Sequence, residues 1–272
     1  MINAGTRVAG VIGSPVRHSL SPALHNAAFT QLGLDWVYLA FEVAPGRAAA
    51  ALDAVRALGL AGLSVTMPHK EAVAAAVDTL DSTASSLRSV NTVVVHPDGR
   101  LIGYSTDGDG LIASLQAVGV AVAGRTTCVL GGGGAARAIC DALGRAGAAR
   151  VAVVNRTAAA AEMAAAMAVA NGVAIGSVGG SRDIADAEIV INATSVGMGT
   201  SELPCDPSLL HAGQVVADIV YHPRETALLL AASAVGAVTV AGLGMLVHQA
   251  ALQQQLWHGA MPDVAVMSAA VA

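Results

Sequence analysis

The chain has 272 residues, of which 54% are hydrophobic and only 12% are charged, so it can bury the core of one large domain or two ordinary ones. Its formal net charge is −5, and the sequence contains no basic stripe or basic tail. Both observations argue against nucleic acid as a partner and favour small molecules.

Short apolar runs alternate with alanine-rich segments of helical length along the whole chain. The expected strands are Arg7–Ile12, Asp35–Glu42, Gly62–Thr66, Val90–His96, Thr127–Leu130, Val151–Val154, Ile189–Asn192, Val215–Asp218 and Ala237–Val240. The expected helices are Ala23–Leu32, Gly46–Leu58, Lys70–Val77, Asp109–Val118, Ala135–Ala146, Ala158–Asn171, Thr226–Val235 and Met245–Gly259. This alternation predicts an α/β fold with mainly parallel sheets that helices cover on both faces. The turn sequence PDGR at residues 97–100 predicts a hairpin with a short strand, Leu101–Tyr104.

Two serines, Ser19 and Ser21, precede Pro22 at the start of the first expected helix. Serine followed by proline is typical of a helix N-cap, and Ser21 fits that position well. The same hydroxyls are also suited to binding a substrate carboxylate. Local rules favour capping and leave both interpretations open.

Lys70 begins an expected helix directly after the Pro68 turn, at the end where the helix dipole favours anions rather than cations. Glu71 offsets this placement, and a solvated lysine is the ordinary interpretation. Further along, Asn91 lies at the front of a strand and Asp107 lies in a glycine-flanked turn that an Asx-turn or a helix cap would explain. A lysine and an aspartate can also share the proton that a nicotinamide site must move.

A glycine loop follows the strand that ends at Leu130. Gly131, Gly133 and Ala136 have G-x-G-x-x-A spacing, and a helix begins directly after them. This strand–loop–helix context is typical of a dinucleotide site, where the free N–H groups of the helix bind a pyrophosphate.

The next strand ends in Asn155, Arg156 and Thr157, where an NAD site usually carries an acidic residue for the ribose hydroxyls. A guanidinium pairs with a 2′-phosphate instead, so Arg156 predicts NADP rather than NAD. The alternative is that Arg156 is an ordinary solvated residue at a helix start.

Several features bear on location. The first ten residues, MINAGTRVAG, lack the apolar region of a signal peptide, and the apolar stretch 227–242 is short for a membrane span. The odd number of cysteines, with no C-x-x-C, argues against a disulfide framework; they are Cys128, Cys140 and Cys205. We therefore expect a cytoplasmic protein with no membrane contact and no metal.

Nine short motifs are distributed over nearly the whole chain, at Ser19–Pro22, Val65–Lys70, Asn91–Thr92, Thr106–Gly110, Gly131–Ala138, Asn155–Thr157, Asn192–Met198, Asp218–Pro223 and Gly242–Gln249. In their residues and their order they resemble the shikimate dehydrogenase family. Each motif alone is weak, whereas nine in order are highly specific.

The resemblance implies a two-domain enzyme with its active site in the cleft between a substrate domain (residues 1–107 and 241–272) and a Rossmann-type NADP-binding domain (residues 108–240). The C-terminal helix would return to the substrate domain. The implied activity is the reversible, NADP-dependent reduction of 3-dehydroshikimate to shikimate in aromatic amino-acid biosynthesis.

The resemblance also assigns site residues. Lys70 and Asp107 match the catalytic pair. The implied substrate contacts are Ser19, Ser21, Thr66, Lys70, Asn91, Asp107, Gln249 and Tyr221, with Tyr221 closing the site. The implied cofactor contacts are Gly131, Gly132, Gly133, Gly134, Ala135, Asn155, Arg156, Thr157, Ile219 and Gly242.

Three positions depart from the family pattern. Ser64 and Ser105 stand where asparagine is usual, and Ala160 stands where a second basic residue often follows N-R-T. Discrimination of NADP from NAD would then rest mainly on Arg156. The departures keep two alternatives open, a quinate or aminoshikimate dehydrogenase of the same fold and, from another class, a non-catalytic NADP(H)-sensing module. Assembly state, including a homodimer, is not determined by the sequence.

Overall fold

The computed structural model describes residues 2–173 and 175–271, and the chain divides into two compact units. Unit 1 contains the chain up to Thr106 together with the segment from Gln249 onward, and unit 2 is Asp107–His248. The first division lies one residue from the expected domain boundary after residue 107. The second lies eight residues beyond the expected boundary after residue 240, within the last long helix.

Unit 1 is built on a mixed six-stranded sheet in the order β2-β1-β3-β5-β6-β4. Its strands are β1 (Arg7–Gly13), β2 (Trp36–Glu42), β3 (Gly62–Val65), β4 (Thr79–Leu80), β5 (Thr92–Val95) and β6 (Leu101–Tyr104). Strands β2, β1 and β3 are parallel, as are β4 and β6, whereas β5 runs antiparallel to both β3 and β6. The hairpin predicted from PDGR is therefore confirmed as β5–β6.

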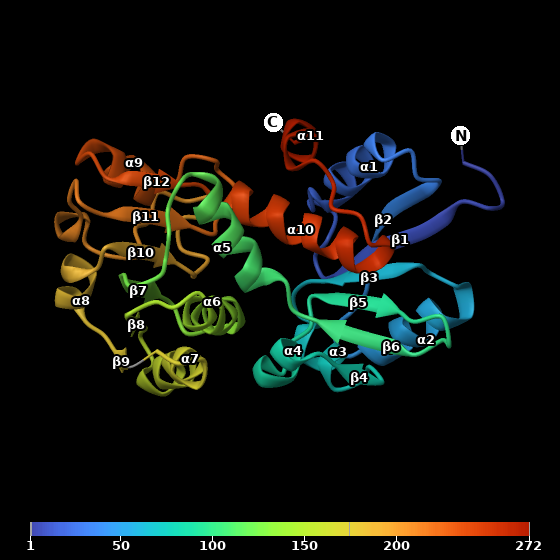
Figure 1. Cartoon of the computed structure of the whole chain (residues 1–272), viewed down its shortest axis with the longest axis horizontal. Helices are drawn as coiled ribbons and strands as arrows, with labels where there is room; N and C mark the ends of the chain where they lie inside the picture. Colours follow the sequence, from blue (N-terminus) through green and yellow to red (C-terminus); the bar gives the residue numbers. More distant parts are fainter. Residues whose placement is uncertain (1, 174, 272) are drawn as a thin grey trace. The chain divides into compact units, whose positions relative to one another are not determined.

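Helices cover both faces of this sheet (Figure 1). They are α1 (Ser21–Gln31), α2 (Ala48–Leu58), α3 (Lys70–Ala74), α4 (Ser82–Leu87), the second half of α10 (Gly242–His258) and α11 (Val264–Ala269). Trp257 of α10 belongs to the core cluster of Phe29 and Tyr38, and a Cβ at Gly62 would come within 2.5 Å of its ring. The expected return of the C-terminal helix is confirmed by this packing.

Unit 2 contains a six-stranded sheet in the order β12-β11-β10-β7-β8-β9, in which every neighbouring pair is parallel. Its strands are β7 (Thr126–Leu130), β8 (Arg150–Val154), β9 (Ile175–Val178), β10 (Ile189–Asn192), β11 (Val215–Asp218) and β12 (Val238–Val240). The order changes direction at β7 and β10, which is the switch point of a doubly wound dinucleotide-binding fold.

Alternate residues of these strands enter two different cores. Val129 packs with α5 (Asp107–Ala117), α6 (Gly134–Arg145) and α7 (Ala158–Ala170), whereas Cys128 and Leu130 pack on the opposite face. That face is covered by α8 (Ser181–Asp186), the 3-10 turn η1 (Pro207–Leu209) and α9 (Ala227–Ala234). Burial on both faces explains why the strands are continuous apolar runs.

Most elements agree with the sequence prediction to within a few residues, and six short ones were not predicted. The missed elements are β4, α4, β9, α8, η1 and α11, none longer than 6 residues. Such segments are too short for a hydrophobic period to emerge. Local capping sets some of them, as where Asp81 accepts a hydrogen bond from the Ala84 amide at the start of α4.

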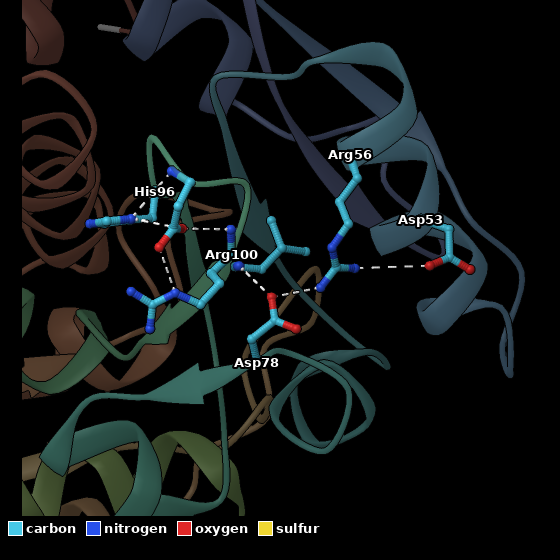
Figure 2. Close-up of polar contacts among 7 residues, drawn as sticks. Asp53, Arg56, Asp78, His96 and Arg100 are labelled. Atoms are coloured by element: carbon cyan, nitrogen blue, oxygen red, sulfur yellow. Dashed lines mark hydrogen bonds and ion pairs between the residues drawn. The ribbon is translucent and has the colours of Figure 1, made fainter.

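A polar cluster ties α2 to the β5–β6 hairpin (Figure 2). Arg56 donates to Asp78 at 2.7 Å, and the same carboxylate oxygen accepts the Leu101 amide at 2.6 Å. These two hydrogen bonds lower the pKa of Asp78, the Leu101 bond most. On the hairpin turn, Arg100 and His96 both lie 2.8 Å from the Asp98 carboxylate.

The cysteines behave as the sequence analysis expected. All three are free, and burial raises the pKa of Cys128 and of Cys140 to about 12, so these two are packing residues. Within residues 2–173 and 175–271, no helix combines the length and the apolar character needed to cross a membrane.

Candidate functional site

The two serines before α1 have separate roles. Ser21 is the first residue of the helix and Leu20 is the N-cap, so the capping interpretation of Ser21 is wrong. Ser19 Oγ instead accepts a hydrogen bond from the Ser21 amide at an N···O distance of 3.2 Å, because the turn places this hydroxyl over the first helical N–H. Ser21 itself is buried, with 8% of its surface exposed.

The segment between β3 and α3 is held on both sides. The Thr66 amide donates to the Ile12 carbonyl at 3.0 Å, and the buried His69 ring contacts the Val43 carbonyl at 2.8 Å. Lys70 follows as the first residue of α3, half-buried, and its carbonyl accepts the Val90 amide at 3.1 Å. The backbone on which Thr66 and Lys70 stand is therefore anchored to neighbouring strands.

Asn91 is the centre of a buried network in unit 1. Its Oδ1 accepts the Thr106 amide at 2.9 Å and the Thr92 hydroxyl at 2.7 Å. Its Nδ2 donates to the Thr106 hydroxyl at 3.0 Å and lies 3.5 Å from Gln249 Oε1. Two predicted substrate contacts, Asn91 and Gln249, are thus brought together from positions 158 residues apart.

Asp107 directly follows Thr106 and is the first residue of α5. It therefore lies inside the helix rather than at its cap, at the end where the helix dipole favours a carboxylate. Close packing explains the glycine at position 108, because a Cβ there would collide with the Ala138 carbonyl of α6.

The glycine loop of unit 2 is shaped by close contacts. Gly131 has a φ of +115°, which disfavours any other residue, and a Cβ at Gly132 would lie 2.9 Å from the backbone of Ala160. Gly133 is the N-cap of α6, and Gly133 and Gly134 are exposed. The N-terminal end of this 12-residue helix is therefore exposed, as a pyrophosphate site requires.

The segment after β8 lies beside this loop, since Ala160 of α7 contacts Gly132. Asn155 fixes the turn by donating to the Thr157 carbonyl at 3.0 Å. Arg156 is exposed, and no residue in 2–173 or 175–271 makes a hydrogen bond or ion pair with its guanidinium. The Arg156 side chain is therefore available to bind a phosphate group.

Sequence reasoning assigned no role to the buried Asp218 at the end of β11. One carboxylate oxygen accepts Asn192 Nδ2 at 2.9 Å and the Val220 amide at 3.0 Å, and the other accepts the Thr226 hydroxyl at 2.7 Å. Burial raises the pKa of Asp218, and these hydrogen bonds oppose the shift. The signal was present in the N-A-T-S and D-x-V-Y-x-P motifs, whose polar residues end two neighbouring strands.

This carboxylate fixes the segment that carries Ile219 and Tyr221. A Cβ at Gly242 would lie 2.5 Å from the Ile219 carbonyl, so these two predicted cofactor positions are in contact. Tyr221 is half-buried, and burial raises its pKa.

A second arrangement that the sequence did not predict links Tyr38, Ser64 and Gln253. Tyr38 donates to Ser64 Oγ at 2.6 Å, and Ser64 donates to Gln253 Oε1 at 2.7 Å. Ser64 is 5% exposed, so the departure from asparagine at this position is accommodated within the unit.

Two family models match the chain. The model of the shikimate dehydrogenase substrate binding domain matches residues 11–93, and that of the shikimate 5'-dehydrogenase C-terminal domain matches residues 242–272.

Among curated relatives, the shikimate dehydrogenase (NADP(+)) of Symbiobacterium thermophilum is 47% identical over 97% of this chain and 93% of its own. The enzyme of the same name from Thermococcus kodakarensis is 45% identical over 99% of this chain and 97% of its own.

Solved structures agree with these relatives. Shikimate 5-dehydrogenase from Thermus thermophilus, in complex with NADP(H) and shikimate, is 36% identical with a TM-score of 0.88, covering 97% of this chain and 98% of that one. Quinate dehydrogenase from Corynebacterium glutamicum, in complex with NAD, is 33% identical with a TM-score of 0.90, covering 98% of both chains. On the identity and coverage of these relatives, the chain belongs to the shikimate dehydrogenase family.

Proposed function

We propose that this protein is a shikimate dehydrogenase that catalyses the reversible, NADP-dependent reduction of 3-dehydroshikimate to shikimate. The observation that carries the proposal is the near full-length identity to enzymes of that name, together with a solved relative that binds both NADP(H) and shikimate. Unit 1 is the substrate-binding part in this proposal, and unit 2 binds the cofactor.

The residues of unit 2 fit NADP. Gly131, Gly132, Gly133, Gly134 and Ala135 form a turn and helix start suited to a pyrophosphate, because Gly133 and Gly134 are exposed and a Cβ at Gly133 would meet nothing within 4 Å. Arg156, flanked by Asn155 and Thr157, is the residue that pairs with the 2′-phosphate. The backbone at Ile219 and Gly242 is assigned to the nicotinamide end. When bound, NADP supplies the hydride chemistry, and the protein contributes binding and orientation.

The residues of unit 1 fit a hydroxylated ring acid. Ser19 and Ser21 are assigned to the carboxylate. Thr66, Asn91 and Gln249 are assigned to the ring hydroxyls, and the buried network holds Asn91 and Gln249 in a defined orientation. Tyr221 is assigned to closing the site.

Lys70 and Asp107 are assigned to proton transfer at the reacting hydroxyl. Each is the first residue of a helix that packs within its own unit, so each has a fixed backbone. In the direction of shikimate oxidation, the pair accepts the hydroxyl proton as the carbonyl forms, and in the reverse direction it returns that proton.

Steady-state kinetics with shikimate or quinate, each with NADP⁺ or NAD⁺, test the proposal. We expect fast turnover with shikimate and NADP⁺ only. Turnover that favours quinate would replace the proposal with its alternative, a quinate dehydrogenase, which the similarity to the Corynebacterium glutamicum enzyme supports. Binding of NADP⁺ with no turnover of either acid would indicate an aminated substrate or a sensing module.

A further inference from the structure

Four groups in unit 1 form one directional chain of hydrogen bonds. The Tyr38 hydroxyl donates to Ser64 Oγ at 2.6 Å, and Ser64 donates to Gln253 Oε1 at 2.7 Å. Gln253 Nε2 then donates to the Asn91 carbonyl at 3.2 Å. Tyr38, Ser64 and Gln253 are each at most 5% exposed, so this chain of hydrogen bonds is shielded from water.

The chain uses the hydrogen-bonding capacity of Ser64 in a particular way. A serine hydroxyl has one hydrogen and two lone pairs, and here the hydrogen goes to Gln253 while one lone pair accepts Tyr38. Ser64 therefore has no hydrogen left to donate to a bound molecule. Gln253 is the residue that removes this donor.

One end of this chain of hydrogen bonds meets residues assigned to substrate binding. Gln253 holds the backbone of Asn91 there, and the Asn91 side chain reaches Gln249, one helical turn before Gln253 on α10. The chain of hydrogen bonds therefore links Ser64 to two of the assigned ring-hydroxyl contacts.

We propose that Gln253 is a positioning residue that, through Ser64, sets which ring substituents the substrate pocket accepts. The inference rests on the proposed function. Because the Ser64 hydrogen is engaged by Gln253, the pocket favours a substrate ring that needs no hydrogen-bond donor from position 64. Releasing the hydroxyl admits a ring with an additional hydroxyl, such as quinate.

The geometry also predicts that positions 64 and 253 are coupled. Asparagine is larger than serine by two non-hydrogen atoms, and the space beyond Ser64 Oγ is filled by Gln253 at 2.7 Å. Ser64→Asn alone must therefore displace Gln253, whereas Ser64→Asn combined with Gln253→Ala has room for the new amide. Residues in direct contact show such non-additive effects.

The test compares the parent, Gln253→Ala, Ser64→Asn and the double variant by kcat and KM for shikimate, quinate and NADP⁺. For Gln253→Ala we expect the ratio of kcat/KM for shikimate to that for quinate to fall about tenfold, which corresponds to the typical effect of one buried hydrogen bond. The change should lie mainly in KM for the acid, with KM for NADP⁺ within about twofold. The double variant should recover most of the melting temperature and of the kcat/KM for shikimate that Ser64→Asn alone loses, because truncation of Gln253 makes room for the new amide.

Gln255→Ala is the matched control, since Gln255 is an exposed glutamine on the same helix and should leave the ratio unchanged. A Gln253→Ala variant that melts at a lower temperature but keeps the parent ratio would overturn the inference, as would additive effects in the double variant. Absence of parent turnover with shikimate would instead contradict the proposed function, so the two failures are distinguishable.

Discussion

Lys70 is the single residue on which the proposed proton transfer depends most. Replacing it with alanine removes a positioned acid–base group, which typically costs about 10²–10⁴-fold in rate. We expect Lys70→Ala to lower kcat for shikimate oxidation by this factor. NADP⁺ affinity, measured by fluorescence titration, should stay within about twofold of the parent, because the glycine loop is untouched. Near-normal turnover in the variant would remove Lys70 from the mechanism.

Arg156 governs the choice between the two nicotinamide cofactors in our proposal. Its exposed guanidinium has no partner among the described residues, so its removal leaves the fold intact. We expect Arg156→Ala to raise KM for NADP⁺ about 10- to 100-fold, since a charge-assisted hydrogen bond contributes about 1.5–3 kcal/mol. KM for NAD⁺ should change little. An equal effect on both cofactors would show that Arg156 does not contact the 2′-phosphate.

His25 makes the stability of unit 1 sensitive to acid. The ring stacks on Tyr38 with centroids 4.1 Å apart, and its pKa is lowered to about 3, chiefly by burial and further by the neighbouring His258. A lowered histidine pKa means that the unfolded chain binds the proton more readily. The contribution of neutral His25 to the free energy of unfolding is therefore fully present above pH 6.5, and it is lost progressively as the pH drops from 6.5 toward 3.

At pH 5 this linkage costs about 2 kcal/mol. Urea unfolding of the parent and of His25→Gln at pH 7.5 and pH 5 measures it. We expect the parent to lose about 2 kcal/mol more than the variant between the two pH values, whatever the offset at pH 7.5. His18→Gln, at an exposed position, serves as the control and should follow the parent. Parallel pH profiles for parent and His25→Gln would contradict the assignment.

At the scale of elements, the glycine loop offers a sharp contrast between neighbouring positions. A Cβ at Gly132 would lie 2.9 Å from the Ala160 backbone, whereas one at Gly133 meets nothing within 4 Å. We expect Gly132→Ala to lower the melting temperature by several degrees, because α7 must move away, and Gly133→Ala to leave it within about one degree. Thermal melts without cofactor make this comparison, and equal melting temperatures would refute the packing role of Gly132.

The elements also show how well the local sequence pattern predicts secondary structure. Strands such as β10 and β11 agree with their predicted ranges because each is a run of three apolar residues bounded by polar ones, inside a chain in which strands and helices alternate. The start of α1 was mispredicted as capped by Ser21, because the serine–proline pattern does not distinguish the N-cap from the next position. Elements such as β4 depend on pairing with β6 and carry little signal of their own.

At the scale of the whole molecule, the two units differ in how continuous they are in sequence. Both cores of unit 2 are drawn entirely from Asp107–His248, whereas a core of unit 1 includes Trp257 from the end of the chain. We expect a fragment of residues 107–248 to unfold cooperatively on heating and to bind NADP⁺. We expect residues 1–106 alone to lack a cooperative transition, since the loss of Trp257 leaves an unfilled core beside Gly62. A cooperative 1–106 fragment would show that the C-terminal segment is dispensable.

The sequence by itself determined the fold class, the glycine loop, the arginine after the second Rossmann strand and the nine motifs that resemble shikimate dehydrogenases. These are properties of short segments, in which spacing and residue type carry the physical information. Tertiary structure alone decided that Asn91 meets Gln249, that Asp218 joins two strand ends and that Gln253 occupies the hydroxyl of Ser64. Ser64 and Gln253 lie 189 residues apart, and a hydrogen bond over that separation exists only because the C-terminal helix packs back against the first sheet.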